Sequence, residues 1–196
     1  NGGLLRVIGG SGNDAIDGSA VTAACRLDVT LGGGRDNVSG GDGSDFFRVA
    51  IGELASNDTI SGGAGALDTL VLSTAGSITG SAFARVTGIE QLKLADGTNT
   101  VTLANGMAAS AGNGLFRVTG GSGNDSVNGA TVSAAVRLDI TLGGGDDSVT
   151  GGAGSDYFSV AAADLTAADH IDGRTGALDM LVLTTAGTIA AGQLAR

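Results

Sequence analysis

The chain contains no proline, no tryptophan and only one cysteine, Cys25. A single cysteine excludes an intrachain disulfide framework. Aromatic residues make up only 3% of the 196 residues, so a core must consist mainly of Val, Leu, Ile and Ala. No uninterrupted apolar run reaches the length of about 18 residues that a membrane-spanning helix needs, and the sequence therefore predicts no membrane insertion.

Basic residues are also scarce. The chain has 10 Lys and Arg against 20 Asp and Glu, giving a net charge of −10. Nucleic acids and anionic membrane surfaces require a basic partner, so we expect neither as a ligand. Nearly all the acids are aspartate, since glutamate occurs only at Glu53 and Glu90. Aspartate favours turns and is a good ligand for hard cations.

Glycine, by contrast, is abundant, with 37 residues, but it does not follow the Gly-X-Y period of collagen. A long internal repeat is present instead. Leu4–Val7 recurs as Leu115–Val118, an offset of 111 (115 − 4), and the offset continues without a gap. We therefore divide the chain into a first unit, 1–111, and a second, incomplete copy, 112–196, within one continuous structure. The break in mid-unit suggests an excerpt of a longer protein.

A shorter period lies inside each unit, because Asp14, Asp36 and Asp58 recur with an offset of 22 (36 − 14 and 58 − 36). Apolar residues follow the same spacing in three predicted columns. The first contains Leu5, Leu27, Val49, Leu72, Leu94, Phe116, Leu138, Val160 and Leu183. The second contains Ile16, Val38, Ile60, Phe83, Val127, Val149 and Ile171. The third contains Cys25, Phe47, Leu70, Leu92, Val136, Phe158 and Leu181.

The apolar residues also alternate along each segment, which is the period of 2 that a strand requires. The pattern predicts an all-β, right-handed parallel β-solenoid with rungs of about 22 residues, five to each 111-residue unit. A disordered Gly-rich linker is the alternative. It would not keep apolar residues in register.

The turns between these strands carry a Gly-Gly-x-Gly-x-Asp motif at 9–17, 40–48, 120–128 and 151–159, with near matches at 31–39 and 142–150. They resemble the RTX nonapeptide repeat of secreted bacterial proteins, which binds calcium. The chain departs from that family in two ways. RTX rolls usually repeat after two nonapeptides, about 18 residues, which is shorter than the period found here. In addition, rungs four and five of each unit lack Asp turns, with Ser81 and Leu103 at the expected positions.

The resemblance implies calcium ions between successive turns. Glycine permits positive φ and close carbonyl approach, and aspartate supplies a hard oxygen to an ion that takes six to eight of them. We expect about six or seven ions. The predicted pairs are Asp14 with Asp36, Asp36 with Asp58, Asp45 with Asp68, Asp125 with Asp147, Asp147 with Asp169, Asp156 with Asp179 and, more weakly, Asp68 with Glu90. The accompanying glycines are Gly10, Gly12, Gly32, Gly34, Gly41, Gly43, Gly63, Gly65, Gly121, Gly123, Gly143, Gly145, Gly152 and Gly154.

The resemblance further implies a structural segment of a large secreted protein, such as an S-layer protein, adhesin or extracellular fibre, exported by type I secretion and folding outside the cell. Expected partners are calcium and further copies of the chain, or further repeats, joined end to end. We expect no enzymatic activity. Two alternatives are a carbohydrate-binding or polysaccharide-modifying β-helix, which needs basic substrate clamps, and an ice-binding solenoid, which needs a regular Thr or Asn array.

Overall fold

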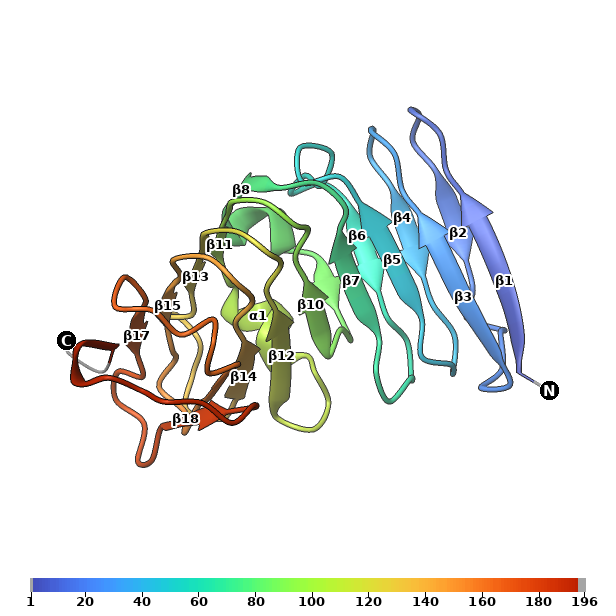
Figure 1. The fold of residues 1–196 in the computed structure, drawn as a ribbon. Coiled ribbons are helices and arrows are strands. Elements are labelled where there is room, and N and C mark those ends of the chain that lie inside the picture. Colours follow the sequence, from blue (N-terminus) through green and yellow to red (C-terminus); the bar gives the residue numbers. More distant parts are fainter. Residues whose placement is uncertain (1, 194–196) are drawn as a thin grey trace.

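The computed structural model describes residues 2–193. Its regular secondary structure consists mainly of short strands in three sheets, and every strand pair is parallel. Nine strands form the long sheet, which runs the length of the molecule (Figure 1). These are β1 (Gly3–Ile8), β3 (Cys25–Thr30), β5 (Phe46–Val49), β7 (Thr69–Leu72), β10 (Gln91–Lys93), β12 (Leu115–Thr119), β14 (Arg137–Thr141), β16 (Tyr157–Val160) and β18 (Met180–Leu183).

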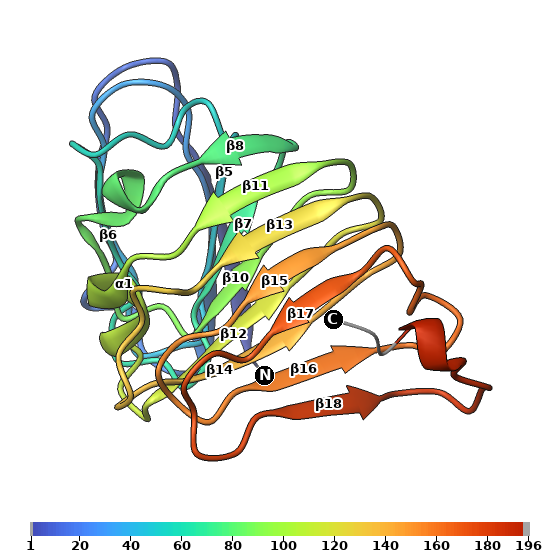
Figure 2. The ribbon, with the colours of Figure 1, turned by 90° about the vertical axis from the view of Figure 1, so that its left-hand side faces the viewer.

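Two further sheets complete the coils. The first short sheet contains β2 (Ala15–Asp17), β4 (Asn37–Ser39), β6 (Thr59–Ser61) and β9 (Val86–Thr87). The second short sheet contains β8 (Gly76–Ile78), β11 (Asn99–Thr102), β13 (Asp125–Asn128), β15 (Ser148–Thr150) and β17 (His170–Asp172), which form a stack in Figure 2. The chain is therefore an all-β parallel solenoid with coils of about 22 residues, as the sequence predicts.

The core lies between the sheets and is filled by alternate residues of each strand. In β3, Leu27 and Val29 are buried and Arg26 is exposed, as the period of 2 requires. Phe47 and Phe158 occupy corresponding places in the two units, and each is almost fully buried. Because every coil contributes the same kind of inward side chain, the core continues from coil to coil.

The strand register differs from the predicted apolar columns. Val7 pairs with Val29, Val29 with Phe47 and Phe47 with Leu70, so the offsets are 22 (29 − 7), 18 (47 − 29) and 23 (70 − 47). The shortest offset corresponds to two consecutive nonapeptides, 31–39 and 40–48, and it recurs between Ile140 and Phe158. Consequently, the predicted neighbours Leu27–Val49, Cys25–Phe47, Leu138–Val160 and Val136–Phe158 are wrong.

A second difference lies at the junction between the two short sheets. Ile60 pairs with Val86, not with Phe83 as predicted. Phe83 ends a short 3₁₀ segment, η1 (Gly80–Phe83), and is buried in the core. β8 and β9 both lie between β7 and β10, so this one coil ends the first short sheet and begins the second.

The next coil contains a short helix, α1 (Asn105–Ala109), which contacts β9 at the end of the first short sheet. Leu92 then pairs with Val118, an offset of 26 (118 − 92), so the predicted neighbours Leu94 and Phe116 are wrong as well. The long sheet nevertheless crosses the junction without interruption. Five of its strands, β1, β3, β5, β7 and β10, precede β12, which gives five to the first 111-residue unit as predicted. A second 3₁₀ segment, η2 (Ala191–Gln193), follows β18.

Candidate metal-binding turns

Each predicted acidic ligand stands at the start of a strand. Asp14, Asp36 and Asp58 directly precede β2, β4 and β6, whereas Asp45 and Asp68 directly precede β5 and β7. The second unit repeats this arrangement with Asp125, Asp147, Asp169, Asp156 and Asp179. Because successive strands stack in parallel, the carboxylates also stack, and they form four acidic columns along the solenoid.

Backbone hydrogen bonds define these columns. The N–H of Asp14 donates to Oδ1 of Asp36, and the N–H of Asp36 donates to Oδ1 of Asp58, both at 2.9 Å. In the neighbouring column the N–H of Asp45 donates to Oδ1 of Asp68 at 2.6 Å. The same contact joins Asp68 to Glu90, Asp125 to Asp147, Asp147 to Asp169 and Asp156 to Asp179. All seven predicted pairs are thus direct neighbours, while metal binding at them stays a prediction.

A second contact folds four of the carboxylates back into their own turns. Oδ2 of Asp14 accepts the N–H of Gly10 at 2.9 Å, and Oδ2 of Asp45 accepts the N–H of Gly41 at 2.8 Å. Asp125 and Asp156 make the same bond to the glycine four residues earlier. The fixed spacing between glycine and aspartate in the motif therefore positions the carboxylate between its own turn and the next coil.

The glycines are required where one turn meets the next. A Cβ atom on Gly32 would overlap the carbonyl oxygen of Gly10 one coil away. Gly143 faces the carbonyl oxygen of Gly121 in the same way. Similar approaches occur at the predicted glycines Gly34, Gly41, Gly43, Gly63, Gly65, Gly123, Gly145, Gly152 and Gly154, whereas Gly10 and Gly12 have open space beside them. Carbonyl and carboxylate oxygens are therefore concentrated between stacked turns, which is the chemistry that calcium prefers.

The columns concentrate negative charge in buried positions. Asp45 and Asp68 are fully buried, and the only ion pairs within 4.0 Å among residues 2–193 involve Asp28, outside the columns. Burial, with smaller contributions from Glu90 and Asp45, raises the pKa of Asp68 to about 7. Burial also raises the pKa of Asp147 to about 6, and it raises the pKa of the carboxyls at Asp36, Asp156 and Glu90.

Asp68 is the carboxylate whose surroundings best fit a bound cation. Its Oδ2 atom is buried and forms no hydrogen bond, a state that costs free energy unless a charge compensates it. Among the described residues, no three Asp, Glu, His or Cys side chains converge as ligands of one ion. An ion between two turns would therefore take part of its coordination from backbone carbonyl oxygens, so the paired carboxylates and carbonyls fit Ca²⁺.

One acidic column of the second unit includes a residue that was not predicted from the sequence. Asn99 precedes Asp125 in its column, and both its backbone N–H and its side-chain Nδ2 donate to Oδ1 of Asp125, at 3.1 and 2.8 Å. Ser81 and Leu103, predicted at two successive positions of this column, do not belong to it, because Ser81 lies in η1 and Leu103 is in the core. A neutral amide thus replaces a carboxylate at the junction, and its offset from Asp125 is 26 (125 − 99) rather than 22.

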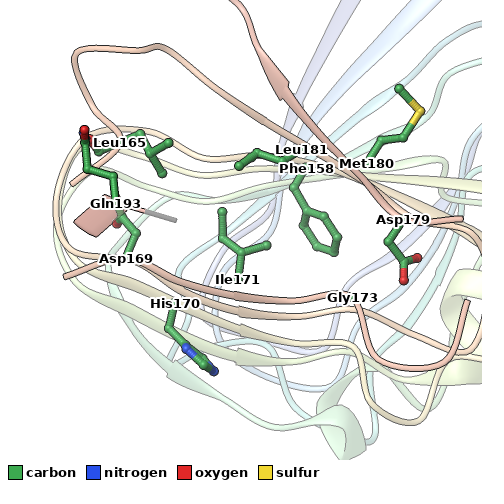
Figure 3. A pocket seen from close by; sticks show the side chains of 10 residues that line it. All are labelled: Phe158, Leu165, Asp169, His170, Ile171, Gly173, Asp179, Met180, Leu181 and Gln193. Carbon is green, nitrogen blue, oxygen red and sulfur yellow. The ribbon is translucent and has the colours of Figure 1, made fainter. Parts of the chain in front are cut away.

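The columns of the second unit reach a pocket beside the last described coil. Asp169, His170 and Asp179 line it together with Phe158, Ile171 and Leu181 (Figure 3). The pocket therefore combines carboxylates from both edges with the apolar interior of the solenoid.

Comparison with known proteins agrees with this geometry. A family model for the RTX calcium-binding nonapeptide repeat, built of four copies, matches residues 6–20, 29–52, 54–66, 117–131 and 139–162. The chain contains RTX calcium-binding nonapeptide repeats. The matches cover the glycine–aspartate turns on both sides of the junction and omit residues 67–116, where Asn99 and α1 lie. No curated protein and no solved structure gives a significant match.

RTX repeats in a parallel β-solenoid identify this segment as a calcium-binding structural repeat. The stretches matched by the family model contain seven of the acidic ligands, namely Asp14, Asp36, Asp45, Asp58, Asp125, Asp147 and Asp156. When bound, calcium supplies positive charge and coordination between coils. No helix among residues 2–193 has the length and hydropathy to cross a membrane.

Proposed function

We propose that this segment is a calcium-stabilised structural element of a larger secreted protein, such as an S-layer protein, adhesin or extracellular fibre, and that it has no catalytic role. The observation that carries the proposal is the set of buried carboxylates stacked from coil to coil without basic partners. Such a stack opposes folding unless a cation compensates it. Folding would therefore wait for the millimolar calcium found outside cells.

The seven stacked pairs would hold about six or seven ions, with the Asp68–Glu90 pair the weakest because Glu90 lacks the complete glycine turn. Each of Asp36, Asp68 and Asp147 belongs to two pairs. These three residues would therefore contribute to ions on both sides and couple neighbouring coils. Such coupling makes calcium binding and folding cooperative along the solenoid.

Circular dichroism in calcium-depleted buffer and then at rising calcium concentration tests the proposal. The expected result is little β structure without calcium and cooperative folding near about 0.1–1 mM. Magnesium at equal concentration should be far less effective, because it demands smaller octahedral geometry. Full β structure in calcium-depleted buffer at neutral pH would contradict the proposal.

We also propose that the solenoid continues end to end, either through further repeats or through further copies. Both outer strands of the long sheet present apolar side chains. Leu5 is 48% exposed on β1, and Leu181 is 38% exposed on β18. Outer strands of this kind readily pair with another chain. Sedimentation velocity in calcium should show oligomers that a Leu5→Lys substitution reduces, whereas a monomer at all concentrations would refute direct self-pairing.

A further inference from the structure

The basic residues of this acidic chain are gathered on one surface. Strand alternation directs one side of the long sheet to the core and the other outward, and we call the outward side the basic face. It carries six of the 10 Lys and Arg residues of the chain and only two of its 20 acids, Asp28 and Asp139. The six are Arg6, Arg26, Arg48, Lys93, Arg117 and Arg137. The rest of the chain therefore has four basic and 18 acidic residues (10 − 6 and 20 − 2).

The basic face also repeats along the axis. The strand register places Arg6, Asp28 and Phe46 in one row. Arg117, Asp139 and Tyr157 form the corresponding row five strands later. At about 4.8 Å per strand, the two rows lie about 24 Å apart. A ligand that contacts both must therefore be an extended molecule that runs along the solenoid.

Most of the cations on this face have no carboxylate partner. Asp28 binds both Arg6, at 3.3 Å, and Arg48, at 2.7 Å. No other ion pair within 4.0 Å exists among the described residues, which leaves Arg26, Lys93 and the two arginines of the second unit unpaired. Arg26 instead stacks on Phe46 at 4.8 Å, and Arg137 stacks on Tyr157 at 4.7 Å. A stacked guanidinium uses its face for the ring and keeps the N–H donors at its edge available.

We propose that the basic face binds a linear polysaccharide that carries carboxylate groups. Planar guanidinium groups bind carboxylates in a bidentate manner, and stacking on Phe46 and Tyr157 holds two of these groups in place. The repetition along the solenoid suits a polymer with repeated charges. The proposal is separate from the structural role and requires only that the solenoid is folded.

The same observations disfavour two other occupants. A nucleic acid would meet 18 acidic residues elsewhere on the chain, and guanidinium groups already occupy the rings on which its bases would stack. A second copy of the chain would offer exposed carboxylates such as Asp42, Glu53 and Asp146 from its turns and not from a flat face, because those of the acidic columns are hydrogen-bonded within their own turns. A carboxylated polysaccharide satisfies the unpaired cations without either difficulty.

Isothermal titration calorimetry on the calcium-folded protein tests the proposal. The probe is a short uronate oligosaccharide that does not gel with calcium, compared with a neutral oligosaccharide of equal length and a single-stranded DNA oligonucleotide. The uronate should bind, and its affinity should fall as salt rises, because screening weakens surface ion pairs. The neutral sugar should not bind, and DNA should bind more weakly than the uronate.

Matched variants locate the surface. Arg137→Gln should weaken uronate binding about tenfold, through loss of one charge-assisted contact. Arg85→Gln removes the same charge from another exposed position, beside β9 of the first short sheet, and should leave the affinity unchanged. Circular dichroism establishes that both variants fold. Equal affinities for the two variants, tighter binding of DNA, or absence of uronate binding would each overturn the proposal. Self-association lost only in Arg137→Gln, without uronate binding, would assign the face to a second copy instead.

Discussion

Replacing Asp68 by asparagine removes the charge of the most perturbed carboxyl while keeping its shape. The asparagine Oδ1 can still accept the N–H of Asp45, which Asp68 Oδ1 accepts at 2.6 Å. The other oxygen, Oδ2, is buried and forms no hydrogen bond. Replacing it with the NH₂ group of asparagine therefore breaks no hydrogen bond. The substitution therefore isolates the effect of charge in the acidic column.

The expected effect has opposite signs with and without calcium. A pKa of about 7 in place of 3.8 disfavours the ionised folded state at pH 8 by at most ~4 kcal/mol. Relaxation of the surrounding turns and water penetration reduce this penalty, and we expect Asp68→Asn to stabilise the calcium-free fold by ~2 kcal/mol. With calcium present, the variant loses a charged ligand in two pairs, and folding should require several-fold more calcium.

The assay has two parts. In calcium-depleted buffer at pH 8, rising concentrations of trimethylamine N-oxide drive folding, and Asp68→Asn should fold at a lower concentration than the parent chain. Near pH 5 the carboxyl of Asp68 is protonated, so the two proteins should behave alike. A calcium titration followed by circular dichroism supplies the second part, with exposed Asp96→Asn as the control. A variant that is less stable without calcium would refute the reasoning, as would an unchanged calcium midpoint.

Three further predictions follow from the same geometry. Asp36→Ala should raise the calcium midpoint of folding more than Asp96→Ala, because Asp36 belongs to two carboxylate pairs. The substitution also leaves the N–H of Asp14 without its acceptor, at a cost of ~1–3 kcal/mol. Equal midpoints for the two variants would contradict the assignment of Asp36 to the acidic column. Gly32→Ala should destabilise the folded protein by ~1–3 kcal/mol or more, whereas Gly33→Ala, which meets open space, should be nearly neutral in thermal unfolding. Because the folded carboxyl of Asp147 has a pKa of about 6, above its ordinary 3.8, the folded state binds more protons between these values. Calcium-free circular dichroism should therefore show structure at about pH 4–5 that is lost as the pH rises through about 6–7, and the opposite trend would refute the burial of these groups.

The sequence was sufficient for the class of fold and the acidic pairs. Alternation of period 2 identified the strands, and the turn motif located most of the carboxylates, since an aspartate of the motif stands at a fixed distance from the glycines of its own turn. Pairs such as Asp14 with Asp36 were predictable because their turns are identical in length and stack directly. The average coil of about 22 residues and the five strands per unit follow from the same repetition.

The exact neighbours in the core were decided only by the tertiary structure. The offsets of 18, 22 and 26 between paired strands differ by even numbers, so each keeps the same side chains pointing inward. The hydrophobic pattern therefore cannot distinguish Leu27 from Val29 as the neighbour of an inward residue on β5. Turn length and strand hydrogen bonding make that choice, and they place Phe47 beside Val29.

The junction and the basic face depend on the same register. Asn99 lies at an offset of 26 from Asp125, so the period of 22 does not reveal it as the neighbour of Asp125. Arg26 and Phe46 lie at an offset of 20 (46 − 26), and only the short coil between β3 and β5 places the guanidinium over the ring. The sequence determined which residues face inward, outward or into a turn, because that depends on local geometry. Which of them meet across coils was decided by the lengths of the intervening turns, and that appears only once the strands have paired.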